Sequence, residues 1–83
     1  MEKTLTLAEI RDKLAAHYRV IFDRWYLLMD EAKVSNLDGD EDAYRAITRR
    51  ADKLSDNMDG IKIAVGVLGI DLADFQSSVN ADR

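Results

Sequence analysis

Residues 60–70 read GIKIAVGVLGI, and the secondary structure of this segment decides the fold class of the chain. Seven of the eleven residues are apolar, three are glycine, and Lys62 is charged. The apolar residues at 61, 63, 65 and 67 have the two-residue period of a β-strand. No other segment predicts a strand, and a solitary strand would leave its backbone unpaired unless it paired with itself across a dimer. We therefore predict a helix that is apolar on all sides, a type that packs centrally.

The helical interpretation extends in both directions from this segment. From Tyr44 to Val79, apolar residues recur alternately at three and four positions, as in a helix that packs along another helix. Gly69 predicts a helix stop, and Asp71 is a candidate N-cap for a new helix. We predict a helix over about 41–68, with a bend at Gly60 left open, and a short helix over about 72–79. A single helix from 41 to 79 is the alternative.

The N-terminal half predicts one long helix. Thr6 and Glu9 form a capping box, and Leu5 and Ile10 can form the hydrophobic staple around it. The apolar residues that follow average about 3.6 positions apart, which predicts a helix over about 7–34. An acidic loop over 35–41 then precedes the second long helix, where its carboxylates suit the helix dipole. The expected fold is all-α, a long helical hairpin with a short C-terminal helix.

Self-association is predicted from apolar residues that one copy cannot cover. A helix of 28 residues is about 42 Å long, which exceeds the width of a compact domain of 83 residues. A chain of this size is marginal as a monomer, and without cysteine it has no disulfide to stabilise it. We predict a two-fold homodimer that forms a four-helix bundle. The predicted interface residues lie outside the apolar stripes along which the two long helices are expected to pack on each other: Val20, Leu27, Val34, Ile63, Val67 and Ile70.

A basic cluster in the second long helix is the predicted partner-binding site. It consists of Arg45, Arg49, Arg50 and Lys53, of which the residues at 45, 49 and 53 share a helix face. Guanidinium and ammonium groups at this spacing can bind phosphate or an acidic protein. The alternative is a charged outer face paired with acidic residues of the first long helix.

Catalytic and metal chemistry find little support in the sequence. Asp52, Asp56 and Asp59 share a helix face, as do the carboxylates that hold magnesium in all-α nucleotide pyrophosphatases, but the first helix lacks the answering Glu-x-x-Glu pattern. His17 has no nucleophile or acid four residues away. We predict no catalytic residue, metal or cofactor, and keep a magnesium-dependent nucleotide phosphohydrolase as one alternative function.

A second alternative comes from a resemblance to a DNA-binding motif. Residues Leu68, Gly69 and Ile70, followed by Phe75, resemble the turn and second helix of a helix-turn-helix over 61–80. The resemblance implies a DNA-binding regulator in which Gln76 and Asn80 read bases. The segment departs from the motif by its aspartates, which would repel phosphate.

We therefore predict a non-catalytic, protein-binding regulator, adaptor or inhibitor, a class that includes phage-type inhibitors. Its expected partners are a second copy of itself and an unidentified protein. The net charge of −4 disfavours nucleic acid as a partner. The N-terminus does not resemble a signal peptide, and the longest apolar run is shorter than the about 20 residues that span a bilayer. We therefore expect a cytoplasmic protein that does not contact membranes.

Overall fold

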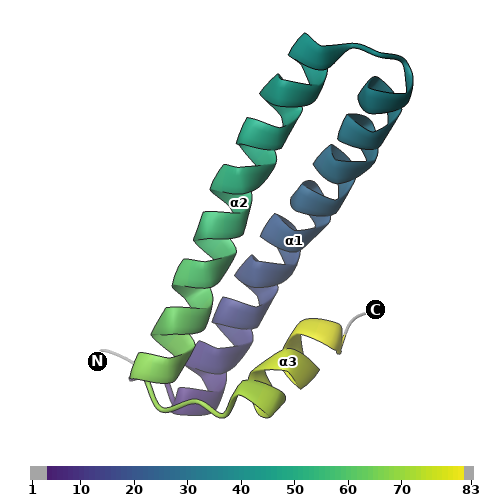
Figure 1. The fold of residues 1–83 in the computed structure, drawn as a ribbon. Coiled ribbons are helices and arrows are strands. Elements are labelled where there is room, and N and C mark those ends of the chain that lie inside the picture. The colour runs from purple at the N-terminus through teal and green to yellow at the C-terminus, as the bar shows by residue number, and fades with distance from the viewer. Residues whose placement is uncertain (1–3, 82–83) are drawn as a thin grey trace.

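The computed structural model describes residues 4–81, and within that range it contains three helices and no strand. The helices are α1 (Leu7–Leu37), α2 (Glu41–Val67) and α3 (Leu72–Asn80). The two long helices form an antiparallel hairpin, and α3 folds back beside the first half of α1 (Figure 1). The predicted all-α fold, a long hairpin with a short C-terminal helix, is confirmed. The apolar segment 60–70 is helical up to Val67, without a break at Gly60.

Both ends of α1 are set by local side-chain and backbone signals. At its start, the Thr6 hydroxyl accepts from the Glu9 amide at 3.1 Å, and the Glu9 carboxylate accepts from the Thr6 amide at 3.4 Å. At its end, Gly39 adopts a φ of +74°, a conformation that costs glycine little. The acidic loop then starts α2, because the Asp40 carboxylate accepts from the Ala43 amide at 3.1 Å. Thus α1 runs three residues beyond the predicted end at residue 34.

The way in which α2 ends explains why Ile70 is buried, although we predicted it at a dimer interface. Gly69 also has a φ of +74°, and its amide donates to the Gly66 carbonyl at 3.1 Å while the Ile70 amide donates to the Val65 carbonyl at 3.0 Å. This Schellman motif normally brings the residue after the glycine into apolar contact with the last helical turn. Ile70 is accordingly 8% exposed and belongs to the core of the single chain. Its assignment to a dimer interface is therefore corrected.

The short helix α3 depends on α1 for its stability, since nine residues are too few for an isolated helix. Phe75 and Val79 are almost completely buried, and the Phe75 ring meets Tyr18 edge to face at 5.6 Å between centroids. Arg19 of α1 donates to the carbonyls of Val79 at 2.8 Å and Ser78 at 3.0 Å, which caps the last turn of α3. The chain therefore holds α3 by an apolar contact and by hydrogen bonds at its C-terminal end.

The core lies mainly at the end of the hairpin that α3 covers. Nine buried residues form it, and toward the loop that joins α1 to α2 the fully buried residues are the small Ala32 and Ala51. The molecule is elongated, with extents of 55 × 25 × 22 Å. Its radius of gyration is 16.1 Å, whereas a compact domain of this length would have about 12 Å. No helix of residues 4–81 is apolar over enough of its length to cross a bilayer.

Candidate protein-binding surfaces

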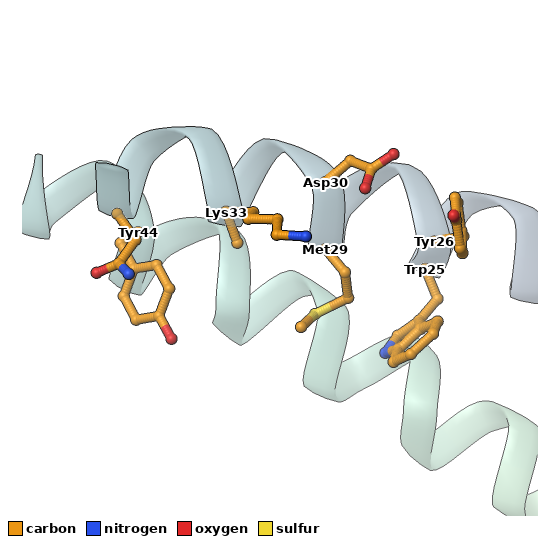
Figure 2. Close-up of a pocket in the computed structure, with 8 residues that line it drawn as sticks. Trp25, Tyr26, Met29, Asp30, Lys33 and Tyr44 are labelled. Atoms are coloured by element: carbon orange, nitrogen blue, oxygen red, sulfur yellow. The ribbon is translucent and has the colours of Figure 1, made fainter. Parts of the chain in front are cut away.

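An apolar groove lies between α1 and α2 on the half of the hairpin near the connecting loop (Figure 2). Its volume is about 470 Å³. Figure 2 shows Trp25 and Met29 pointing from α1 toward α2, whereas Asp30 points away from α2. The lining consists of Trp25, Tyr26, Met29, Asp30, Ala32, Lys33 and Asn36 of α1 and Tyr44 of α2. We call this surface the aromatic groove.

The groove exists because α3 is short. The C-terminal end of α3 reaches Tyr18 and Phe22, and Asn80 is its last residue. Among the described residues 4–81, no third helix lies over the next turns of α1 on the same side, which begin at Trp25 and Tyr26. The side chains in these turns are exposed to solvent: Tyr26 is 56% exposed, and Met29 and, from α2, Tyr44 are 39% and 40% exposed. An apolar strip that α3 covers over its first half is thus open over its second half.

Sequence reasoning did not find this groove, although its signal was present. Trp25, Met29 and Tyr44 lie in or beside the apolar stripes that we expected to be packed between the two long helices. Those stripes are as long as the hairpin, but the predicted third helix has only about two turns. Comparing the length of the stripes with the length of the covering helix would have predicted an uncovered segment.

The basic cluster of α2 is exposed and lies outside the groove lining. Arg45 approaches Glu41 of the same helix at 3.9 Å, and both side chains are mostly exposed, so this ion pair adds little stability. Within residues 4–81, Arg49, Arg50 and Lys53 make no ion pair, either with α1 or within α2. The structure thus does not support the alternative in which the acidic residues of α1 neutralise this face.

The predicted interface residues fall on two different surfaces. Val20, Leu27 and Val34 lie along the outward side of α1, with exposures of 51%, 63% and 57%; we call them the outer stripe. Ile63 and Val67 are 67% and 81% exposed on the outward side of α2, opposite the buried Ile61 and Val65. The two surfaces belong to helices whose buried sides face each other, so they point away from each other.

The acidic residues serve as helix caps or lie in solvent. Asp38 is the C-cap residue of α1 through its backbone amide, and Asp40 is the N-cap residue of α2. Asp52, Asp56 and Asp59 are exposed along α2. Across residues 4–81, no three His, Cys, Asp or Glu side chains come together as metal ligands would. Asp12 accepts from the Ser78 hydroxyl at 2.9 Å, and this hydrogen bond, followed by one from Arg11, lowers the pKa of the Asp12 carboxyl. That contact helps to hold α3 on α1.

The helix-turn-helix resemblance is weakened by how α3 packs. In that motif the second helix packs on the first, but α3 lies mainly on α1 and touches α2 little. Asp71 is the N-cap of α3 and Asp74 lies in its first turn, where a recognition helix would approach phosphate. Gln76 and Asn80 are exposed beside Tyr18 and Phe22. The two residues that would read bases thus share a helix with Asp71 and Asp74 and lie beside aromatic side chains of α1.

Comparisons of the chain with protein-family models, with curated proteins and with solved structures returned no match.

Proposed function

We propose that this chain is a non-catalytic protein-binding regulator, adaptor or inhibitor that receives an amphipathic helix of another protein in the aromatic groove. The observation that carries the proposal is that α3 leaves open the second half of the apolar strip on which it packs. A helix bound there would continue the line of α3 along the hairpin.

The chemistry of the groove suits an amphipathic helix. α3 fills the first half of the strip with Phe75 and Val79, an apolar pair spaced by four residues. The open half, from Trp25 to Asn36, is about 17 Å long, which is the length of a helix of about 11 residues. Methionine adapts to differently shaped apolar residues, and hydrophobic grooves receive the apolar face of amphipathic helices. We expect the partner helix to present apolar residues four positions apart.

The basic cluster adds a charge preference to the proposal. Arg45, Arg49, Arg50 and Lys53 lie on the same helix as Tyr44 and are exposed to solvent. Exposed charges of this kind mainly accelerate the encounter with an oppositely charged protein and contribute less to the lifetime of the complex. We therefore expect an acidic partner whose binding slows when salt is added or when Arg49 is changed to Glu.

A site-specific photocrosslink in the native cells tests the proposal. A benzophenone amino acid at position 26, on the rim of the groove, should give one discrete adduct with another protein. The matched control is position 72 in α3, because Leu72 is 58% exposed and Tyr26 is 56% exposed. Met29→Glu should abolish the adduct at position 26, since a carboxylate would then lie in the apolar groove. The same adducts from both positions, or none from position 26, would refute the proposal.

A further inference from the structure

We infer that a second copy of this chain docks on the outer stripe of α1, with the two α1 helices antiparallel and a two-fold axis passing beside Leu27. This contact lies on the side of α1 opposite its buried residues, and the only residue it shares with the lining of the aromatic groove is Asp30. It restricts the predicted homodimer interface to α1 and leaves out Ile63 and Val67 of α2.

The spacing of the outer stripe is self-complementary. Val20 precedes Leu27 by seven residues, and Val34 follows it by seven. Seven residues are close to two helical turns, so all three side chains stay on one side of α1 over about 21 Å. In an antiparallel pair centred on Leu27, that residue meets its own copy and Val20 meets Val34 of the second copy. A two-fold interface requires such a self-matching surface.

Charged residues beside the stripe match in the same register. Arg24 lies three residues before Leu27 and Glu31 lies four residues after it, both on one flank of the stripe and both exposed. A two-fold axis perpendicular to both helices places this flank on the same side of the interface in both copies. Along the helix axis, Arg24 then lies within about one residue of Glu31 of the second copy. Within residues 4–81 neither side chain has an ion-pair partner. The pairing occurs twice in the dimer.

The opposite flank limits the affinity. Asp23 and Asp30 lie there, and the same register brings Asp23 level with Asp30 of the second copy. Like charges at this distance oppose association, so we expect a dimer that forms at micromolar concentrations and above rather than a permanent one. Replacing Asp30 with Asn should tighten the dimer, because it removes one charge from each repulsive pair.

The exposed area of the chain leaves room for such an interface. The accessible surface is 6213 Å², whereas a compact monomer of 9.4 kDa would expose about 5,000 Å². A standard interface covers about 800 Å² of each partner, which is less than this excess. Covering the outward side of α1 would therefore bring the surface of each copy toward that of an ordinary folded protein.

Sedimentation equilibrium between about 5 µM and about 500 µM tests the inference, a range that brackets a weak interface. We expect the mass to rise from 9.4 kDa toward twice that value. Leu27→Asp should hold the chain monomeric over this range. The matched control Ile63→Asp, at a residue of similar exposure on α2, should leave the dimer unchanged. A chain that is monomeric throughout, or a dimer that Leu27→Asp leaves intact or Ile63→Asp dissociates, would overturn the inference.

A charge-reversal cycle tests the antiparallel register. Arg24→Glu and Glu31→Arg should each weaken the dimer about tenfold, because each change makes both cross-dimer pairs repulsive. The double variant should recover the wild-type dissociation constant, since the pairs are then attractive again with their signs exchanged. All these positions are exposed, so circular dichroism should show an unchanged helix content. A double variant as weak as the single variants would rule out this register.

Discussion

Replacing Phe75 with alanine should remove much of the stability of this protein. Phe75 has an exposed fraction of 0% and is the largest side chain in the core with no accessible surface. Truncation of a buried Phe to Ala costs about 3–5 kcal/mol, including the cavity that remains. The edge-to-face contact with Tyr18, with ring centroids 5.6 Å apart, is lost as well, and its contribution is included in that range of free energies. We therefore expect the free energy of unfolding to fall by about 4 kcal/mol.

This loss is large for a chain of 83 residues, whose whole stability should be about 4–12 kcal/mol. Urea denaturation followed by circular dichroism, at protein concentrations where the chain is monomeric, measures the free energy by linear extrapolation. Leu72→Ala is the matched control, because Leu72 lies in the same helix but is 58% exposed, and its truncation should cost about 0.5 kcal/mol or less. If Phe75→Ala costs no more than Leu72→Ala, then α3 does not pack on α1 as described.

Three further predictions concern the glycines, the α3 contact and magnesium. Gly60→Ala should stabilise the protein by about 0.5–1 kcal/mol, because Gly60 is helical and an added methyl group meets no atom within 4 Å. Gly69→Ala should destabilise the protein by about 1–2 kcal/mol, because an alanine at this positive φ is strained. The melting temperatures of the two variants should therefore shift in opposite directions. The pKa of Asp12 is lowered in the folded protein, so its ionised carboxylate favours the folded state. This stabilisation is present above the ordinary pKa of 3.8 and is lost as the pH falls through the lower pKa of the folded state. The difference in melting temperature between wild type and Asp12→Asn should therefore disappear in acid. Millimolar magnesium should leave the melting temperature unchanged, whereas a rise would favour the alternative of a magnesium-dependent phosphohydrolase, because an ion that binds the folded state stabilises it.

The helices could be predicted because their signals are local. The capping box at Thr6, the caps at Asp40 and Asp71 and the positive-φ glycines each act over four or five residues, a distance that can be read directly from the chain. The burial of Ile70 could also have been predicted from its neighbours in the sequence, since the residue after a Schellman glycine normally packs back on the helix. The interface prediction used the helical period beyond Gly69, where the helix had already ended.

The candidate sites were predicted less well, because they depend on what covers each surface. Helical periodicity separates the outward side of α1 from its inward side, and the exposure of Val20, Leu27 and Val34 agrees with that separation. It could not separate the covered from the uncovered part of the inward side. That distinction depends on the direction and length of α3 relative to α1, two elements that are distant in the sequence.

The sequence by itself determined the secondary structure of this protein, including the helical state of residues 60–67, because backbone pairing and capping leave an isolated apolar segment few choices. Only the tertiary structure decided that α3 packs on α1 rather than on α2, and that it ends before Trp25. Phe75 and Val79 require an apolar surface, but either long helix could have provided one. The hydrogen bonds from Arg19 to the last turn of α3 join residues about sixty positions apart, and together with the burial of Phe75 they hold α3 on α1.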